Sequence, residues 1–201
     1  MIAAIVPFKA PPEGKSRLRE VLDDAERRRL ALDVLRHVVS TLERAEPIDA
    51  VFVLARADPG VGRRLLDTGR TLNQGLRQAL AWVGDQGFAA ALVAPADLPH
   101  LSPADVERLL AALPPASGGV VAPAKDGGTG GLALRPATLI QPAFGRRSAD
   151  RHLALIRAAG GSAVAIDSRG WATDLDTPAD LELLRRSHQL TDFALIAGSR
   201  D

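Results

Sequence analysis

The stretch that decides the expected fold is Ala89-Ala90-Ala91-Leu92-Val93-Ala94-Pro95-Ala96-Asp97-Leu98-Pro99. Its first half is a continuous apolar run of strand length, as expected for a parallel strand covered on both faces. Asp97 follows beyond the carboxyl end of that strand, where open α/β sheets place their ligand sites. The next motif, Ser102-Pro103-Ala104-Asp105, offers a serine N-cap, a proline at the first helical position and an early acidic residue. The stretch therefore predicts a strand, a loop that carries one carboxylate, and a helix.

The same alternation of short apolar runs and amphipathic stretches extends over most of the chain. It predicts strands at 2–6, 50–55, 89–94, 119–122, 132–134 and 163–166. It predicts helices at 24–44, 61–67, 72–83 and 148–159, and further helices that begin after Ser102 and after Thr177. Alternating elements of this kind favour an α/β fold of three layers with a mostly parallel mixed sheet. We expect one domain over residues 1–187 and a C-terminal tail at 188–201 with no assigned role.

Composition excludes several classes of protein. The 201 residues are 46% hydrophobic and 24% charged, which excludes disordered and collagen-like chains. The net charge of +1 gives no reason to expect nucleic acid or an anionic membrane as a partner. There is no cysteine, so no disulfide or thiolate metal site is available. The first seven residues lack the basic region of a signal peptide, and no apolar run approaches the roughly 18 residues that span a bilayer. We expect a cytoplasmic protein that does not bind membranes.

Three carboxylates predict a divalent-metal site. Asp174 and Asp176 stand one residue apart in Asp174-Leu175-Asp176-Thr177-Pro178, and Asp97 is the third candidate. Mg²⁺ prefers hard oxygen ligands and is commonly shared between one or two carboxylates and substrate phosphates. The alternative is that Asp174 and Asp176 only cap the helix behind Thr177. That alternative does not serve for Asp97, because the helix after it has a cap of its own.

The loop after the first strand carries candidate phosphate-binding cations. Gly14-Lys15-Ser16 suggests a Walker-type loop, but such a loop needs a glycine at position 9, which is Lys9, and backbone N–H groups that Pro11 and Pro12 lack. A different arrangement remains open, in which Lys9, Lys15 and Arg17 bind a triphosphate through their side chains. The alternative is a solvated basic loop.

Two further segments carry candidate ligand-binding groups. The glycine-rich run 124–131 contains Thr129, whose hydroxyl would donate to a carboxylate or phosphate; the alternative is a plain hairpin connection. Phe144-Gly145-Arg146-Arg147-Ser148 leads into a helix whose N-terminus favours anions. Ser148 is either the N-cap or a ligand contact. His152 is expected to be a structural hydrogen-bonding residue, since no second histidine lies at ligand spacing.

In this order, the motifs resemble those of the guanylyltransferases of deazaflavin coenzyme (F-420) biosynthesis, from about residue 2 to residue 186. The motifs are Pro7-Phe8-Lys9, Lys15-Ser16-Arg17-Leu18, Pro95-Ala96-Asp97-Leu98-Pro99, Asp126-Gly127-Gly128-Thr129, the run from Phe144 to His152, and Asp174-Leu175-Asp176-Thr177-Pro178. The resemblance implies a glycosyltransferase-A-like nucleotidyltransferase fold. It also implies that the protein transfers GMP from GTP to a small phosphorylated acid and releases pyrophosphate. The acid would be 2-phospho-L-lactate, phosphoenolpyruvate or 3-phosphoglycerate.

The resemblance also implies roles for single residues. Asp97, Asp174 and Asp176 would be catalytic and would hold two Mg²⁺ ions. Lys15 would be the catalytic cation that faces GTP. The remaining implied contacts are Lys9, Arg17 and Asn73 for the nucleotide and Thr129, Gly145 and Ser148 for the acid. A homodimer is expected on the same ground.

Two features depart from the family pattern. Gly130-Gly131 stands where family members often have Asn-Ala, so the identity of the acid is open. The stretch between Leu66 and Leu72 is short, so the preference for guanine is open as well. The alternatives are another nucleotidyltransferase of this fold, of the molybdopterin or sugar-phosphate type, and a nucleotide-binding paralogue without catalysis. The single glycine between Pro7 and Lys15 disfavours the first, and the presence of all three aspartates disfavours the second.

Overall fold

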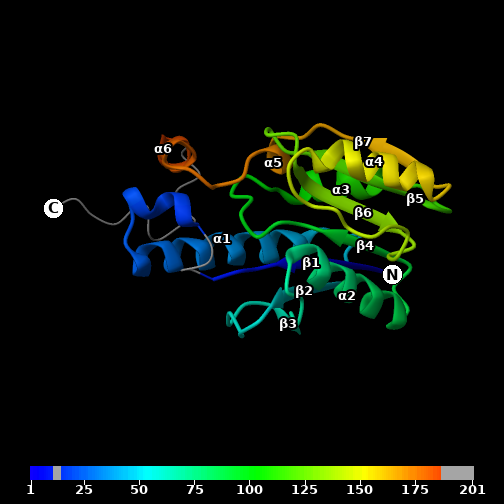
Figure 1. Cartoon of the computed structure of the whole chain (residues 1–201), viewed down its shortest axis with the longest axis horizontal. Helices are drawn as coiled ribbons and strands as arrows, with labels where there is room; N and C mark the ends of the chain where they lie inside the picture. Colours follow the sequence, from blue (N-terminus) through cyan, green and yellow to red (C-terminus); the bar gives the residue numbers. More distant parts are fainter. Residues whose placement is uncertain (11–14, 187–201) are drawn as a thin grey trace.

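One mixed sheet forms the centre of the structure (Figure 1). The structure is a computed structural model that describes residues 1–10 and 15–186. In the described part the sheet has seven strands in the order β3-β2-β1-β4-β6-β5-β7, and only β6 runs antiparallel to its neighbours. The strands are β1 (Ile2–Pro7), β2 (Ala50–Ala55), β3 (Arg63–Leu66), β4 (Ala90–Val93), β5 (Gly118–Pro123), β6 (Thr129–Arg135) and β7 (Ser162–Ala165).

Helices cover both faces of this sheet. The helices of the described part are α1 (Asp24–Arg44), α2 (Leu72–Asp85), α3 (Pro103–Ala111), α4 (Ser148–Ala158), the short α5 (Arg169–Ala172), α6 (Pro178–Arg186) and a 3₁₀ helix, η1 (Ser16–Glu20). Alternate residues of β1 separate the two cores. Ala4 and Val6 pack with α1 and α3, whereas Ala3 and Ile5 pack with α2 and with strands of the other face. This period of two is that of a strand buried on both sides. The expected three-layer α/β architecture with a mostly parallel mixed sheet is confirmed.

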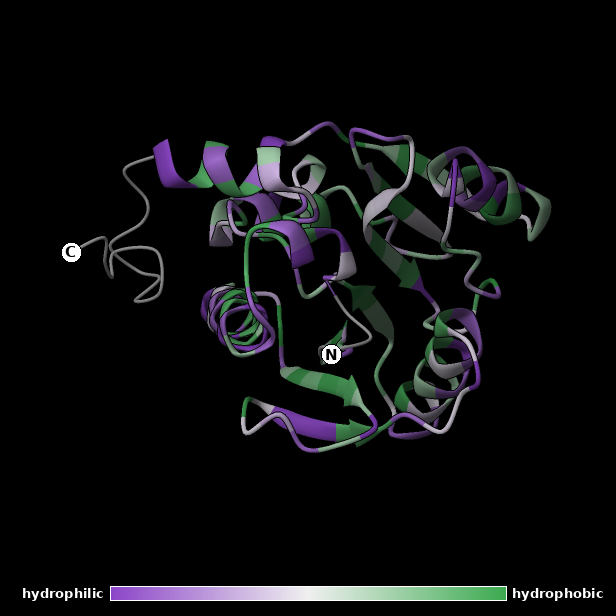
Figure 2. Cartoon of the chain, turned by 60° about the vertical axis from the view of Figure 1, so that its left-hand side comes forward, coloured by the Kyte–Doolittle hydropathy of each residue, from purple (hydrophilic) through white to green (hydrophobic). Residues whose placement is uncertain are grey.

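Helix α1 shows how the sequence sets these elements. Asp23 caps it: the Asp23 carboxylate accepts from the backbone N–H of Glu26, and the Glu26 carboxylate accepts from the N–H of Asp23. This capping box satisfies two donors that a helix start leaves free. The buried face of α1 repeats at helical spacing, with Leu30, Val34 and Val38 all buried. Figure 2 shows the result, with apolar strands inside and polar outer faces on the helices.

The short helix predicted at 61–67 is wrong. Residues Arg63–Leu66 form the edge strand β3, which pairs in parallel with β2. A helix this short gains little stability by itself, whereas the free edge of β2 offers backbone hydrogen-bond partners. Strand β6 begins at Thr129, earlier than predicted, so Gly130 and Gly131 belong to the sheet. The segment 124–128 is the hairpin connection between β5 and β6, as the plain alternative had it.

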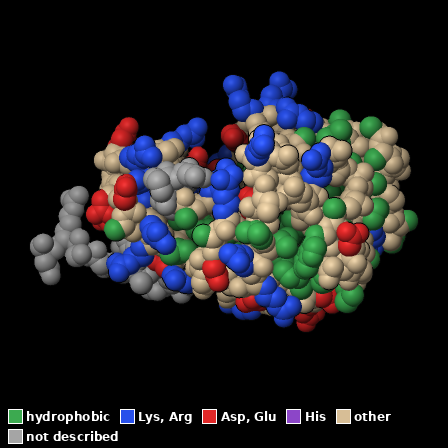
Figure 3. All heavy atoms as spheres, turned by 60° about the horizontal axis from the view of Figure 1, so that its bottom comes forward, with side chains coloured by type: hydrophobic (Ala, Val, Ile, Leu, Met, Phe, Trp, Pro, Cys, Tyr) green, Lys and Arg blue, Asp and Glu red, His purple; other side chains and the backbone are tan. Residues whose placement is uncertain are grey.

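The predicted tail, 188–201, lies outside the described residues. Among the residues that are described, none of the helices has the length and apolar character to cross a membrane. On the face in Figure 3, basic and acidic side chains are interspersed, with a group of basic side chains along the upper edge. This mixed surface matches the near balance of 25 basic and 24 acidic residues in the sequence.

Candidate functional site

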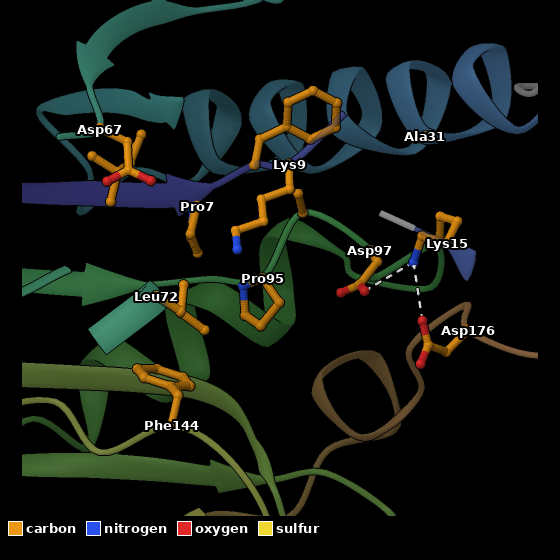
Figure 4. A pocket seen from close by; sticks show the side chains of 13 residues that line it. Pro7, Lys9, Lys15, Ala31, Asp67, Leu72, Pro95, Asp97, Phe144 and Asp176 are labelled. Atoms are coloured by element: carbon orange, nitrogen blue, oxygen red, sulfur yellow. Dashed lines mark hydrogen bonds and ion pairs between the residues drawn. The ribbon is translucent and has the colours of Figure 1, made fainter. Parts of the chain in front are cut away.

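A cavity of about 340 Å³ opens beyond the carboxyl ends of β1, β2 and β4. This is the edge at which parallel sheets present their ligand sites, and the volume falls in the range of small-molecule pockets. Figure 4 shows its elongated layout, with Lys15, Asp97 and Asp176 at one end and Asp67 at the other. The lining residues are Pro7, Phe8, Lys9, Lys15, Ala31, Leu54, Asp67, Leu72, Pro95, Ala96, Asp97, Phe144 and Asp176.

Lys15 joins two of the predicted carboxylates. Its Nζ donates to Asp97 Oδ2 at 2.9 Å and to the carbonyl oxygen of Leu175 at 2.5 Å, and it lies 3.9 Å from Asp176 Oδ1. The Lys15 side chain is 8% exposed, so its charge is screened little by water. Charge-assisted hydrogen bonds of this kind are among the strong ones. The structure thus places residues that are 82 and 160 positions apart in direct contact.

The backbone holds the two carboxylate segments together. The N–H of Leu175, which stands between Asp174 and Asp176, donates to the carbonyl oxygen of Asp97 at 2.9 Å. Asp174 and Asp176 do not cap the helix that follows. Thr177 and Asp180 do so instead: the N–H of Asp180 donates to Thr177 Oγ1 at 3.2 Å, and Asp180 Oδ2 accepts from the N–H of Thr177 at 2.8 Å. The capping alternative is therefore excluded for both side chains.

Carboxylates outnumber cations at the Lys15 end of the cavity. Burial raises the pKa of Asp174 above its usual value, and the charges of Asp97 and Asp176 raise it further, while Lys15 and a backbone hydrogen bond act in the opposite direction. Carboxylate oxygens are of the type that Mg²⁺ prefers. The chemical type and the negative charge of these oxygen atoms therefore suit Mg²⁺. Their present spacing does not: within residues 1–10 and 15–186, no three acidic or histidine side chains stand close enough together to hold a metal ion.

The other predicted cations differ in their position. Arg17 Nη1 donates to Asp176 Oδ2 at 3.2 Å, but the arginine side chain is 70% exposed and the pair lies at the rim. Lys9 lines the cavity between its two ends (Figure 4). Lys15 itself precedes η1 with a φ of 57°, the left-handed region that non-glycine residues seldom adopt. A strained backbone at this lysine is typical of a residue whose side-chain position matters.

The three residues predicted to bind the acid form one network with His152. Thr129 Oγ1 lies 2.9 Å from both Ser148 Oγ and His152 Nδ1, and the N–H of Ser148 donates to the carbonyl oxygen of Gly145 at 3.1 Å. The N–H of Ala143 donates to His152 Nε2 at 2.9 Å. Because Nε2 accepts, Nδ1 carries the proton and donates to Thr129. In the hydrogen bond between Thr129 and Ser148 either hydroxyl can be the donor, and the Ser148 side chain is fully buried.

Two expectations about this segment change. Ser148 is not the N-cap of α4, because Arg147 takes that position with a φ of 51° and no side-chain hydrogen bond to the helix. The backbone N–H groups of Ser148 and Ala149 already donate to Gly145 and Gly127, so fewer donors face an anion than the sequence predicted. His152 is the structural hydrogen-bonding residue that was expected. Burial, followed by the charge of Arg151, lowers its pKa to about 4, so the ring is neutral near pH 7.

The Asn73 side chain is hydrogen-bonded to the backbone of Phe144, a residue that lines the cavity. Its amide nitrogen donates to the carbonyl oxygen of Phe144 at 3.0 Å, and its amide oxygen accepts from the N–H of Phe144 at 2.7 Å. Both polar atoms of the Asn73 side chain are thus engaged with the backbone. Phe144 lines the cavity and meets the ring of His152 edge to face at 4.9 Å. The role that the structure gives Asn73 is to position Phe144.

The sequence of nearly the whole chain matches one family model. The family is described as guanylyl transferase CofC like, and the match covers residues 2–188. The chain belongs to this family. Among CofC-like relatives, the phosphoenolpyruvate guanylyltransferase of Sphaerobacter thermophilus is 40% identical over 90% of this chain and 91% of that protein. The 2-phospho-L-lactate guanylyltransferase of Methanopyrus kandleri is 33% identical over 88% and 87%. The 3-phospho-D-glycerate guanylyltransferase of Phenylobacterium zucineum is 32% identical over 90% and 88%.

Solved structures support the fold of this CofC-like chain. A Desulfovibrio desulfuricans protein named as a nucleotide-diphospho-sugar transferase superposes with a TM-score of 0.78 at 18% identity, over 98% of this chain and 92% of that one. A 4-diphosphocytidyl-2C-methyl-D-erythritol synthase superposes with a TM-score of 0.61 at 19% identity, over 91% and 96%. The nucleotidyltransferase fold expected from the sequence is therefore confirmed.

The departure at Gly130-Gly131 has a packing explanation. A Cβ at Gly130 would lie 1.8 Å from the carbonyl oxygen of Trp171, and a Cβ at Gly131 would lie 2.8 Å from the Trp171 ring. Trp171 is fully buried, and its Nε1 donates to the carbonyl oxygen of Asp105 at 3.1 Å. In this CofC-like chain the two glycines thus make room for Trp171, which reaches the sheet from α5. The sequence did not predict a role for Trp171, although this residue, one of two tryptophans in the sequence, stands two positions before Thr173-Asp174.

Proposed function

We propose that this CofC-like protein transfers GMP from GTP to a small phosphorylated acid and releases pyrophosphate, a step of coenzyme F-420 biosynthesis. The observation that carries the proposal is the contact of Lys15 with Asp97 and Asp176 at one end of an elongated cavity. A lysine among carboxylates at the carboxyl edge of a parallel sheet suits a nucleoside triphosphate, whose phosphates need both a cation and metal ligands.

The reaction needs little covalent chemistry from the protein. A phosphate oxygen of the acid attacks the α-phosphorus of GTP in line. The new O–P bond forms as the bond from the α-phosphorus to the bridging oxygen breaks, and pyrophosphate leaves with that electron pair. A phosphate is already ionised near neutral pH, since its second pKa is about 6, so no general base is required. Positioning and charge stabilisation carry catalysis in such transfers.

Lys15 is the residue best placed to stabilise charge. Its Nζ is fixed by Asp97 and the Leu175 carbonyl, so it is ordered before the substrate arrives. Lys9 would contact the triphosphate from the middle of the cavity, and Arg17 from its rim.

Asp97, Asp174 and Asp176 would hold two Mg²⁺ ions. Bound there, Mg²⁺ supplies Lewis-acid neutralisation of the phosphate charge. The backbone bond from Leu175 to Asp97 and the charge of Lys15 bring Asp97 and Asp176 to one place. Asp174 stands beside them with a raised pKa, and the charge of Lys15 acts against that rise.

Thr129, Gly145 and Ser148 would bind the phosphorylated acid. Their support is the network that holds the two hydroxyls together: the neutral His152 donates to Thr129, whose Oγ1 lies 2.9 Å from Ser148 Oγ. Ser148 is fully buried and Thr129 is 7% exposed, so of the two only Thr129 reaches the surface. Among the three acids, phosphoenolpyruvate is the first to test, since it appears in the name of the relative that is 40% identical.

The test is pyrophosphate release from GTP and Mg²⁺ with each of phosphoenolpyruvate, 2-phospho-L-lactate and 3-phosphoglycerate, with the product identified by mass. A guanylylated acid is expected with at least one of them. Asp97→Asn should abolish the product. Asp85→Asn, an exposed aspartate at the end of α2, is the matched control and should leave turnover intact. GTP binding without product for all three acids would overturn the proposal.

A further inference from the structure

The cavity has a second end whose chemistry differs from the phosphate end. Asp67 lies there, apart from Lys15, Asp97 and Asp176 (Figure 4). Leu72 and Phe144 line the neighbouring wall. An apolar wall beside a single polar group suits a flat, partly apolar ligand with a few hydrogen-bonding atoms at its edge. A nucleoside triphosphate has that asymmetry, with phosphates at one end and a base at the other.

The Asp67 carboxylate is held in place but is only partly used. Its Oδ1 accepts from the N–H of Gly69 at 2.9 Å, a turn that fixes the side chain. Its position also depends on Gly75 in the first turn of α2, where a Cβ would lie 2.4 Å from Oδ1 and 3.4 Å from Oδ2. None of the ion pairs among the described residues includes Asp67, and none of the hydrogen bonds found in that part of the chain reaches Oδ2. A half-buried carboxylate therefore keeps acceptor capacity for a ligand.

Among the common bases, guanine matches such a group. Its edge presents two adjacent donors, N1–H and the 2-amino group, and a carboxylate accepts both in parallel. Adenine and cytosine each place a ring acceptor next to their amino group, so a carboxylate would meet one donor and one lone pair. Uracil places its single N–H between two carbonyl oxygens.

We propose that Asp67 reads the N1–H and 2-amino edge of guanine and so determines which nucleotide this enzyme uses. The inference rests on the proposed function, because it assumes that the phosphates of the same nucleotide lie at the Lys15 end. Phe144, whose backbone exchanges two hydrogen bonds with the Asn73 side chain, forms the wall beside the base. Asp67 is thus a specificity-determining residue at the end of β3, far from the reacting atoms.

The test compares Asp67→Asn with the unaltered protein. Affinity is measured by displacement of a ribose-labelled fluorescent GTP analogue with GTP, ITP, XTP and ATP, so it needs no transferase activity. Inosine lacks the 2-amino group, and the unaltered protein should bind ITP about tenfold more weakly than GTP. Xanthine carries a carbonyl oxygen in place of the amino group, and an asparagine amide can accept from N1–H and donate to that oxygen. Asp67→Asn should therefore lower the GTP to XTP affinity ratio by about a hundredfold.

Two further variants separate base reading from local structure. Asp58→Asn is the matched control: Asp58 Oδ1 accepts from the N–H of Gly60 at 2.9 Å in the same kind of turn, but its side chain is exposed and outside this cavity. It should leave all four affinities unchanged. Gly75→Ala should push the carboxylate aside while it keeps the charge, and so weaken GTP about tenfold without improving XTP.

The outcomes are distinct. An unchanged GTP to XTP ratio in Asp67→Asn would overturn the inference, as would an equal loss of GTP affinity in Asp58→Asn. If Asp67→Asn lowers the GTP to XTP ratio as expected but the unaltered protein transfers GMP to none of the acids, the proposed function fails and the assignment of Asp67 stands. If GMP is transferred but the ratio is unchanged in Asp67→Asn, the proposed function stands and the assignment of Asp67 fails.

Discussion

Acidification should unfold this protein partly through one buried ring, that of His152. Its pKa in the folded state is about 4 against 6.5 in an exposed ring. Between these two values the unfolded chain binds a proton that the folded chain does not, so stability falls as the pH falls. The stabilisation is fully present above about pH 6.5 and is lost progressively down to about pH 4.

The size of the effect follows from the shift. One pKa unit corresponds to about 1.4 kcal/mol, so acidification from pH 7 to pH 5 should remove about 2 kcal/mol through His152 alone. The full shift amounts to about 3 kcal/mol. The structural cause is burial with both ring nitrogens engaged: Nε2 accepts from Ala143, and protonation would leave two N–H donors facing each other. About 2 kcal/mol is a large fraction of the stability of an ordinary domain.

The assay is urea unfolding at pH 7, 6 and 5 for the unaltered protein and for His152→Gln and His152→Asn. Glutamine can still accept from Ala143, and asparagine can still donate to Thr129, but neither titrates. Each variant should be about 1–3 kcal/mol less stable at pH 7, because one buried partner is lost. Each should then lose about 2 kcal/mol less than the unaltered protein on going to pH 5.

The comparison with the two variants isolates the effect of His152. Other groups, the three clustered aspartates among them, also respond to pH, but they are common to all three proteins, so their contributions cancel in the difference. Equal pH slopes in the variants and the unaltered protein would refute the reasoning. So would a His152 ring that titrates near 6.5 by NMR in the folded protein.

Three further predictions concern the site and its support. Lys15→Met should reduce kcat/KM for GTP about a thousandfold while thermal unfolding still shows a folded protein, because a preordered charge is lost; a loss below tenfold would contradict its role. Gly131→Ala should destabilise the protein by about 1–3 kcal/mol in urea unfolding, since its Cβ would lie 2.8 Å from the Trp171 ring, and neutrality would show that Trp171 can move. Asp174→Asn should weaken Mg²⁺-dependent turnover at every pH, and chelation by EDTA should abolish turnover of the unaltered protein; activity that survives EDTA would refute the metal assignment.

The sequence predicted the layers well because the strands and helices of this chain are locally consistent. The run 89–94 has a hydrophobic pattern for a doubly covered strand, and the Ser102-Pro103 start is a helix signal that tertiary contacts do not override. The error at 61–67 has the opposite origin. Arg63-Arg64-Leu65-Leu66 consists of residues that favour a helix, and pairing with the open edge of β2 overrides that local preference.

The sequence predicted the charged residues of the candidate site but not which of them are in contact with one another. Asp97 and Asp176 were visible as carboxylates at element ends, and Lys15 as a cation after the first strand. Their contact joins residues 82 and 161 positions apart, a pairing that only the order of the strands brings about. Asp67 could not be found, because its segment was assigned to the wrong element and because a carboxylate in a turn has a plain structural use.

The arrangement around Lys15 explains why its backbone tolerates a φ of 57°. A non-glycine residue in this region costs about 1–3 kcal/mol, and a hydrogen bond to a charged group contributes about 1.5–3 kcal/mol. Lys15 Nζ makes two such bonds, to Asp97 and to the Leu175 carbonyl, with Asp176 nearby. The strain is therefore offset only while the carboxylate segments stay tied together by the backbone bond from Leu175 to Asp97. Removal of the Asp97 charge should release Lys15 into an ordinary conformation, so the metal ligands and the catalytic cation depend on one another for their positions.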